Sequence, residues 1–296
     1  PLGLPLQATL CESCGQCVST CPTGALVSKT YLPKPGPWQL ETVSSVCPRC
    51  GIGCSLELKA IANKVVEVTS PIGNAVNDGN LCKKGAYDYL HSIHSPGRLR
   101  APLVRQNSHL VETSWEEALA IASEGLKQVR DRHGGHSLAV LASQELTNEE
   151  NYLAQKLARV ALGTNNISST VPSISKLNLA KSFGKNASTC SFNDILTSDL
   201  ILVFSCDITA EYPVIASKIR KAVDQGSKLV IINTQATRLD PLAKVTFKVN
   251  PRMTQELLRT MLDYIFHYEL IDRDFVMQRT TGLENLQREM KQYPLE

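Results

Sequence analysis

Eight cysteines within the first 82 residues constrain this chain more than any other feature of its sequence. The stretch VCPRCGIGCSLEL holds Cys47, Cys50 and Cys54, and Cys82 follows much later in GNLCKKG. A loop with three thiolates, closed by one remote thiolate, suits the four corners of a [4Fe–4S] cubane. Zinc is the main alternative because it also takes four thiolates, although structural zinc sites usually draw on two separated pairs.

The first four cysteines form a second set. Cys11, Cys14, Cys17 and Cys21 have the spacing C-x2-C-x2-C-x3-C, and Pro22 follows directly. Bacterial ferredoxins have this run, in which the first three cysteines hold one cubane and the fourth reaches a different one. The partner ligands of both cubanes are absent from this chain. We therefore expect an internal piece of a longer polypeptide, in which these clusters are completed.

Composition narrows the class of protein. The chain has 296 residues, 43% of them hydrophobic, and a net charge of +3 that gives no electrostatic case for a nucleic-acid partner. Its apolar runs are too short for a membrane span. Cysteines clustered at one end of so long a chain indicate metal binding in a reducing compartment rather than a disulfide framework. The expected location is cytoplasmic.

Apolar runs and capping signals predict the fold that follows the cysteines. The stretch SLELKAIANKVVEVTS predicts two strands around a turn near Asn63, and KGAYDYLHSI predicts a short helix. Ser114 and Thr147 each open a capping signal before a helix that ends at glycine. The apolar runs 199–205 and 228–233 predict parallel strands, joined by a helical crossover and covered on both faces.

These patterns predict an α/β chain in four parts, with a small β-containing Fe–S-binding domain followed by a parallel-sheet, Rossmann-like domain. The expected parts are the C-terminal half of a two-cluster ferredoxin module (1–32), a proline-rich linker (33–44), the [4Fe–4S]-binding domain (45–105) and the α/β domain (106–296).

Three motifs, VCPRCGIGCSLEL, GNLCKKGAYDYLHS and GRLRAPLVR, together resemble the molybdopterin oxidoreductase (DMSO reductase) family. Within it the chain looks most similar to NAD-linked formate dehydrogenase alpha subunits and to the large iron–sulfur subunit of complex I-type NADH dehydrogenases. The likeness runs from about Val46 through the last predicted strands, and such subunits carry a ferredoxin module directly upstream. Family members are considerably longer, which implies that the C-terminal part of the fold is missing here.

The resemblance implies a bis-pterin guanine dinucleotide cofactor, with molybdenum or tungsten, that exchanges electrons with the cubane. In the family, a lysine two residues after the last cysteine lies between cluster and pterin. Here that residue is Lys84, whose ammonium would stabilise negative charge on the reduced cluster. The alternative is that Lys84 is one solvated member of a Lys-Lys pair.

The expected metal ligand departs from the family pattern. Formate dehydrogenases carry a metal-binding cysteine or selenocysteine, followed by histidine, in the segment that matches residues 167–177, and here that segment has neither. Ser173 or Ser175 could offer a serine oxygen to the metal, with a loop or helix-capping role as the alternative.

The expected pterin contacts are also altered. Loops at the carboxyl ends of two strands should contact the dinucleotide. The first loop offers Ser205 and Asp207, and Asp207 could instead cap a helix. The second offers Asn233 and Gln235 where the family has an aspartate and an arginine, and Arg252 replaces an expected glycine. These changes indicate a weakened or lost pterin site.

The sequence therefore predicts an iron–sulfur electron-transfer component of a multisubunit oxidoreductase, linked to NAD(P)H or ferredoxin through other redox subunits. Two alternatives stay open. One is a catalytic molybdenum or tungsten subunit of the formate dehydrogenase type, and the other is a zinc-stabilised interaction module without redox activity.

Overall fold

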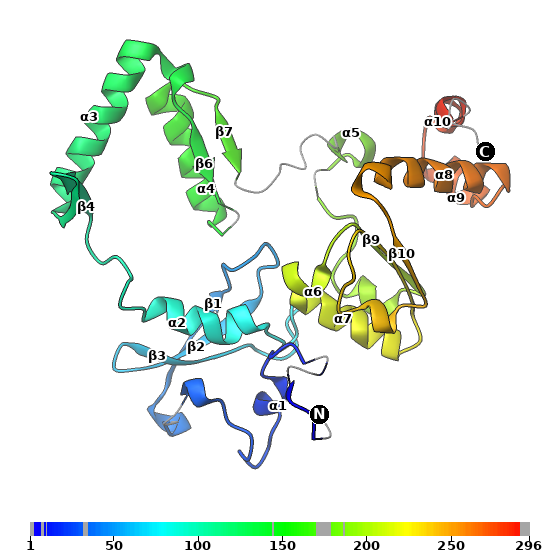
Figure 1. The fold of residues 1–296 in the computed structure, drawn as a ribbon, viewed down its shortest axis with the longest axis horizontal. Helices are drawn as coiled ribbons and strands as arrows, with labels where there is room; N and C mark the ends of the chain where they lie inside the picture. The colour runs from blue at the N-terminus through cyan, green and yellow to red at the C-terminus, as the bar shows by residue number, and fades with distance from the viewer. Residues whose placement is uncertain are drawn as a thin grey trace. The chain divides into compact units, whose positions relative to one another are not determined.

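The structure is a computed structural model that describes residues 3–6, 9, 11–31, 35–143, 145–169, 179–185 and 187–290. The chain divides into two compact units, residues 1–194 with 212–214 and residues 195–211 with 215–296. Both contain helices and small sheets (Figure 1), so the fold is of the mixed α/β kind. Within the described ranges, no helix is both long enough and apolar enough to cross a membrane.

A three-stranded antiparallel sheet follows the N-terminal cysteines. Its strands are β1 (Glu41–Val46), β2 (Ser55–Ile61) and β3 (Lys64–Thr69), in the order β1-β2-β3. Ala62 and Asn63 both have positive φ, at 46° and 61°, as a two-residue hairpin turn requires. The predicted turn near Asn63 is therefore confirmed.

Strand β1 was not expected, since its first residues belong to the predicted linker 33–44. The strand pairs with β2 without interruption, from Glu41 opposite Ala60 to Val46 opposite Ser55. Its register is set by this long-range pairing, because its side chains are mostly exposed and give no alternating apolar pattern. The proline-rich stretch consequently ends before Glu41.

The predicted short helix is also present, with an unexpected first turn. A π-helical segment, η4 (Lys84–Asp88), leads into α2 (Tyr89–Ile93). The Ala86 amide donates to the Cys82 carbonyl over 2.9 Å at the start of this segment. The sheet, the helical segment and the loop before it each contribute buried residues to this region: Leu56, Val68, Leu81, Ala86 and Leu90.

The rest of the first unit contains two capped helices and two short sheets. Its elements are β4 (Leu103–Gln106), β5 (His109–Glu112), α3 (Trp115–His133), β6 (Val140–Ala142), α4 (Asn148–Lys156), the π-helical segment η6 (Leu157–Leu162), β7 (Ile167–Ser169) and α5 (Leu179–Phe183). The Thr147 and Glu150 side chains bond reciprocally to each other's backbone amides, as in a capping box. Both predicted helices are thus confirmed.

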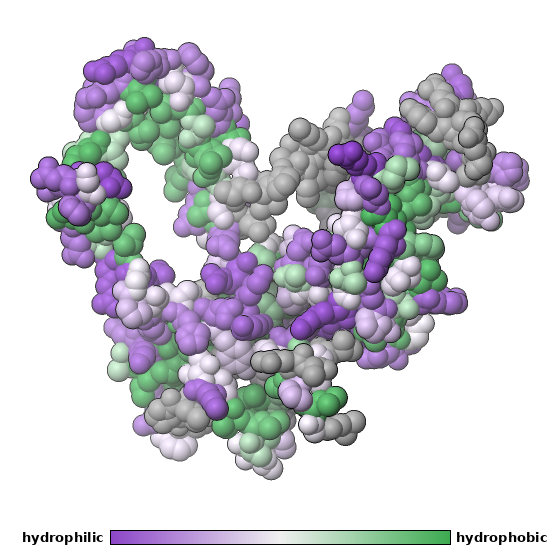
Figure 2. All heavy atoms as spheres, in the orientation of Figure 1, coloured by the Kyte–Doolittle hydropathy of each residue, from purple (hydrophilic) through white to green (hydrophobic). Residues whose placement is uncertain are grey.

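Helix α3 leaves much of its apolar side in solvent. Trp115 is 69% exposed and Leu119 is 60% exposed. Figure 2 shows apolar atoms gathered over the segment that carries α3 and α4. The amphipathic pattern therefore predicted helix α3 correctly, but it does not identify what packs against the apolar side of that helix.

The second unit is built on a parallel three-stranded sheet of order β10-β9-β8. The strands are β8 (Leu200–Phe204), β9 (Lys228–Asn233) and β10 (Val245–Lys248), and α7 (Pro213–Asp224) forms the predicted crossover between β8 and β9. Further helices are α6 (Ile208–Glu211), α8 (Thr254–His267), α9 (Arg273–Arg279) and α10 (Leu283–Met290). Its core contains Val203, Ala216, Ile219, Leu229, Ile231 and Leu239.

Only part of the expected sheet burial is found. Strand β9 is central, and its neighbouring residues Ile231 and Ile232, which point to opposite faces, are 1% and 5% exposed. Strand β8 was expected to be covered on both faces, but Leu200 and Leu202 on one face are 58% and 45% exposed. That expectation is wrong for β8 because it lies at the sheet's edge and buries Val203 on one face against the core.

Candidate metal centre

Three of the four candidate ligands lie on the loop that joins β1 to β2. Cys47 follows β1 directly, Cys54 precedes β2, and Cys50 lies between them. The Cys47 amide donates to the Cys54 carbonyl over 2.9 Å, which closes the loop at the end of the ladder. Gly53 has φ +70°, so this tight return needs a residue without a side chain.

The fourth ligand approaches the same loop from the start of η4. The thiols of Cys47, Cys50 and Cys82 all lie close enough to Cys54 to influence its ionisation. On the next turn, a Cβ added at Gly85 would lie 3.5 Å from the Cys47 sulfur. The structure thus brings together the four cysteines that the sequence singled out, which we call the four-cysteine site. Their role as ligands stays a prediction.

The site is buried, and burial decides the ionisation of its thiols. Cys47 and Cys54 are each 6% exposed. Burial, and after it the thiols of Cys47, Cys50 and Cys82, raise the pKa of Cys54 from 9.0 to about 12. Burial also raises the pKa of Cys47, against an opposing hydrogen bond from the Arg49 backbone. Without metal, both thiols are therefore neutral at physiological pH, and thiolate coordination must release their protons.

This burial predicts a pH effect on the cluster-free protein. Because the folded pKa of Cys54 exceeds its ordinary value, the folded state is favoured below pH 9, and stability is lost as pH rises from 9 towards 12. Relative to a Cys54→Val variant, the native sequence should lose about 2 kcal/mol of unfolding free energy between pH 8 and pH 10.5. Urea titrations at both pH values measure the difference. Equal pH dependence in the two proteins would contradict the prediction.

Asn77 is a site residue that the sequence reasoning missed. Its side chain is fully buried, accepts from the Ser55 amide over 2.9 Å, and donates to the Asn80 carbonyl over 2.6 Å. Ser55 follows Cys54 directly, and Asn80 lies two residues before Cys82. One amide therefore ties the three-cysteine loop to the segment that delivers the remote cysteine.

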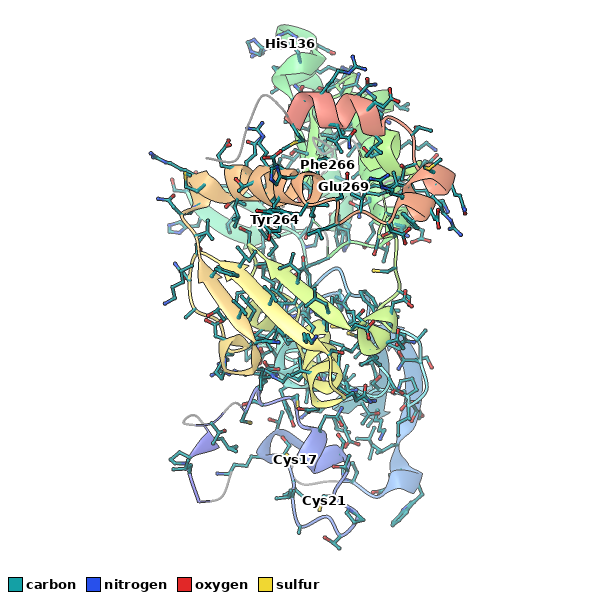
Figure 3. All side chains as sticks on the ribbon, turned by 90° about the vertical axis from the view of Figure 1, so that its right-hand side faces the viewer. Cys17, Cys21, His136, Tyr264, Phe266 and Glu269 are labelled. Carbon is teal, nitrogen blue, oxygen red and sulfur yellow. The ribbon has the colours of Figure 1, made fainter. Side chains whose placement is uncertain are left out.

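The N-terminal cysteines lie on a loop and on α1 (Gln16–Ser19), which carries Cys17 (Figure 3). Hydrogen bonds, first from the Leu26 backbone and next from the Thr23 side chain, lower the pKa of Cys21 to about 7. Such donors favour a thiolate, as an iron ligand requires. The assignment of Cys11, Cys14, Cys17 and Cys21 to clusters stays a prediction.

The donor set can be tested against a single ion. Within the described residues, no group of three or more histidine, cysteine, aspartate or glutamate side chains could hold one metal ion. A tetrahedral zinc would need four sulfur atoms at about 2.3 Å from one point. The donor set itself, four soft thiolates with three on one loop, suits the corners of a [4Fe–4S] cluster. The ten cysteines, all within the described residues, form no disulfide.

Lys84 is the first residue of η4, and its side chain is exposed. The preceding residue, Lys83, is exposed as well. Lys84 is thus adjacent in sequence to Gly85, which contacts the four-cysteine site. This placement is compatible both with a relay position and with the solvated Lys-Lys pair, so the role of Lys84 stays a prediction.

The candidate pterin contacts lie in the second unit at the ends of β8 and β9. Asp207 Oδ1 accepts from the Thr209 amide and hydroxyl, over 3.0 and 2.6 Å, and so caps α6. Asn233 is 8% exposed, donates to the Cys206 carbonyl over 3.1 Å and accepts from the Thr234 amide over 2.8 Å. Asp207 Oδ1 and the Asn233 side chain thus bond within their own loops, and their role as dinucleotide contacts stays a prediction.

The remaining candidate cofactor and metal contacts have fewer described interactions. Ser205 has φ 54°, and its amide donates to the Ile232 carbonyl over 2.8 Å. Gln235 is exposed. Ser173 and Ser175 lie outside the described residues.

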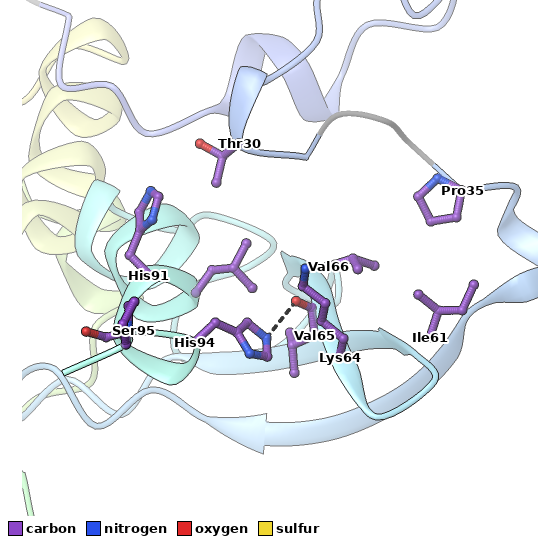
Figure 4. Close-up of a pocket in the computed structure, with 11 residues that line it drawn as sticks. Thr30, Pro35, Ile61, Lys64, Val65, Val66, His91, His94 and Ser95 are labelled. Atoms are coloured by element: carbon purple, nitrogen blue, oxygen red, sulfur yellow. Dashed lines mark hydrogen bonds between the residues drawn. The ribbon is translucent and has the colours of Figure 1, made fainter. Parts of the chain in front are cut away.

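A cavity of about 640 Å³ lies beside α2 and the β2–β3 hairpin (Figure 4). Its walls include Ile61, Val66 and Leu90, together with His91 and His94. The His94 Nε2 atom lies 3.0 Å from the Val65 carbonyl, which holds this ring against the hairpin. No cysteine lines this cavity, so it is separate from the four-cysteine site.

Comparison with known proteins gives three family matches. Residues 98–261 match the molybdopterin oxidoreductase family, residues 40–92 match the molybdopterin oxidoreductase Fe4S4 domain, and residues 6–27 match the 4Fe-4S binding domain. These domains indicate iron–sulfur clusters and a molybdopterin cofactor. The second match contains the whole three-cysteine loop and Cys82, which favours iron over zinc there.

Curated relatives are longer than this chain. It is 35% identical over 258 residues to the F420-dependent formate dehydrogenase subunit alpha of Methanocaldococcus jannaschii, which covers 86% of this chain and 37% of that protein. It is 33% identical over 288 residues to the NADPH-Fe(3+) oxidoreductase subunit alpha of Geobacter sulfurreducens, covering 96% of this chain and 33% of that protein. The chain thus spans about a third of their length.

The fold has a counterpart among solved structures. Acetylene hydratase from Pelobacter acetylenicus superimposes with a TM-score of 0.68 over 85% of this chain and 35% of its own, at 21% identity. That likeness concerns the fold alone. With the family match extending over more than half of its residues, the chain belongs to the molybdopterin oxidoreductase family.

Proposed function

We propose that this chain is the electron-transfer portion of a multisubunit oxidoreductase and that Cys47, Cys50, Cys54 and Cys82 hold its [4Fe–4S] cluster. The observation that carries the proposal is the approach of four thiols from two distant parts of the chain to one buried place. When bound, such a cluster supplies one-electron chemistry without proton transfer.

The chain's own residues would control that chemistry. Burial of Cys47 and Cys54 excludes water, and a low local dielectric shifts the potential of a charged centre. Asn77 fixes the separation of the two ligand-bearing segments. The ammonium of Lys84, two residues after Cys82, would stabilise added negative charge.

The N-terminal cysteines extend this role. Cys11, Cys14 and Cys17 would hold one further cluster and Cys21 another, with partner ligands from outside this chain. In this proposal, residues 1–32 are the ferredoxin half-module and 106–296 the α/β domain, while the linker that begins at residue 33 ends before β1, so the cluster domain starts at Glu41. Because similar proteins are named alpha subunits, we propose other redox subunits, linked to NAD(P)H or ferredoxin, as partners in the cytoplasm.

A second candidate is a catalytic molybdenum or tungsten subunit that oxidises formate. The identity of 35% to a formate dehydrogenase alpha subunit favours it. The internal bonds of Asp207 and Asn233 count against it, because those side chains serve their own loops. The two candidates differ in whether the intact protein holds a pterin.

Anaerobic purification of the full-length subunit, with iron, sulfide, molybdenum, tungsten, pterin and zinc quantified, tests both. The electron-transfer proposal expects iron and sulfide in equal amounts with little pterin or molybdenum. Stoichiometric pterin with molybdenum or tungsten would replace it by the catalytic candidate. Zinc without the broad visible absorbance of iron–sulfur proteins would overturn both.

A further inference from the structure

A glutamine joins the N-terminal cysteine loop, residues 11–21, by hydrogen bonds to the segment just before Cys82. The Gln16 side-chain amide donates to the Asn80 side-chain oxygen over 2.7 Å and to the Gly79 carbonyl over 3.0 Å. Gln16 precedes Cys17 directly, and Asn80 lies two residues before Cys82. A contact across more than sixty residues of sequence thus joins one cysteine set to the other.

The hydrogen bonds continue from Asn80 into the four-cysteine site. The Asn80 carbonyl accepts from the buried Asn77 amide, whose oxygen accepts from the Ser55 amide next to Cys54. Gln16, Asn80 and Asn77 therefore form one connected network that reaches both ligand-bearing segments. Because Asn77 is fully buried, this network has a rigid anchor.

A second contact lies beside the first. Gly15 packs against the Tyr87 hydroxyl so closely that an added Cβ would overlap it, and Gly15 has φ +79°. Tyr87 belongs to η4, the segment that starts two residues after Cys82 and carries Gly85 against Cys47. The Tyr87 side chain thus reaches from η4, the segment after Cys82, to the backbone between Cys14 and Cys17.

A cavity of about 270 Å³ lies between the N-terminal cysteine loop and the segment on either side of Cys82. Cys14 and Cys21 line it from the N-terminal loop, and Leu81, Ala86 and Tyr87 line it from the other side. The ligand-bearing segments therefore face each other across a few side chains. Electron transfer between two centres depends steeply on their separation, so whatever fixes this spacing fixes the rate.

We propose that Gln16, bonded to Asn80, is a positioning residue that holds the N-terminal cluster loop at a fixed distance from the four-cysteine site, with Tyr87 as the packing surface between them. The inference rests on the proposed function. The clusters that the two cysteine sets would hold would supply one-electron chemistry, in which a reduced cluster on the loop would be oxidised as an oxidised cluster on the four-cysteine site is reduced. No bond forms or breaks, and the first electron comes from a low-potential one-electron donor.

The test uses the full-length subunit with Gln16→Met, which keeps the side chain's length and removes its donors without adding charge near a cluster. The matched control is Gln128→Met, since Gln128 is an exposed glutamine on α3 bonded to Glu124 over 3.0 Å. Iron and sulfide are measured first. Magnetic coupling between clusters is then read by electron paramagnetic resonance after dithionite reduction, and the intercluster rate is read after flash reduction.

We expect Gln16→Met to keep its clusters, to weaken the magnetic coupling, and to slow intercluster transfer severalfold, because electron transfer weakens steeply as the two centres move apart. Asn80→Ala should act alike, and the double variant should be no slower than either single one. Gln128→Met should match the unmodified subunit. Unchanged coupling and rate with intact clusters would overturn the inference while leaving the proposed function standing.

Two further outcomes are decisive. Loss of iron from Gln16→Met alone would overturn the positioning role, because Gln16 would then serve cluster assembly. If the unmodified subunit holds no iron, the proposed function fails. Hydrogen–deuterium exchange then tests whether the Gln16 hydrogen bonds hold the N-terminal loop. Gln16→Met should raise exchange in residues 11–21, and exchange equal to that of the unmodified subunit would refute this role.

Discussion

Replacing Cys54 by serine is expected to remove about four iron and four sulfide ions per chain from the full-length subunit, because a [4Fe–4S] cluster is held by four thiolates and Cys54 is one of the two buried ones. A serine hydroxyl does not ionise near neutral pH and is a harder ligand than a thiolate. Chemical iron and sulfide assays, with the visible absorbance of the protein, measure the loss.

Cys190→Ser is the matched control. Cys190 is an exposed cysteine, distant in sequence from both cysteine sets, and its replacement should leave iron, sulfide and absorbance unchanged. If Cys54→Ser retained the full iron content, the four-cysteine assignment would be wrong. Zinc lost in place of iron would instead support the zinc alternative.

Replacing Asn77 by alanine should lower the free energy of unfolding of the cluster domain by about 2 to 4 kcal/mol, because the change leaves the Ser55 amide and the Asn80 carbonyl without their buried partner. The same change frees the three-cysteine loop from the segment that carries Cys82. Iron retention during gel filtration should therefore fall together with stability. Urea unfolding followed by fluorescence measures the first effect.

The exposed Asn148 at the start of α4 offers a control of the same residue type. Asn148→Ala should change the unfolding free energy by less than about 0.5 kcal/mol, as surface substitutions usually do. An Asn77→Ala protein as stable as the Asn148→Ala protein would show that the amide does not brace the site.

Local signals in the sequence predicted much of the fold. The turn at Asn63, the capping box of Thr147 and the crossover between β8 and β9 were all correct, because each depends on residues close together in the chain. Strand β1 was missed, since only its pairing with the remote β2 defines it. The exposure of Leu200 was missed for a similar reason, because an apolar run does not reveal whether its strand is central or at an edge.

The candidate site shows the same division. Cysteine spacing pointed to the four thiols that the structure brings together, because ligand number and type are written in the sequence. Asn77 and Gln16 were missed because their partners lie 22 and 64 residues away, and an asparagine in a turn-rich stretch is typical of ordinary loops. For Asp207 the sequence left a dinucleotide contact and a helix cap open; the structure shows its Oδ1 capping α6, and the contact stays a prediction.

The π-helical turn between Cys82 and α2 makes chain length itself a determinant of the cluster site. A π-helical turn has one residue more than an α-helical turn. Deleting one residue of Lys84–Asp88 would restore ordinary winding and rotate everything before the deletion by about 100° relative to α2. With Leu90 held in the core, Cys82 would then point away from its three partners. Residues 84–88 should therefore tolerate substitutions far better than deletions.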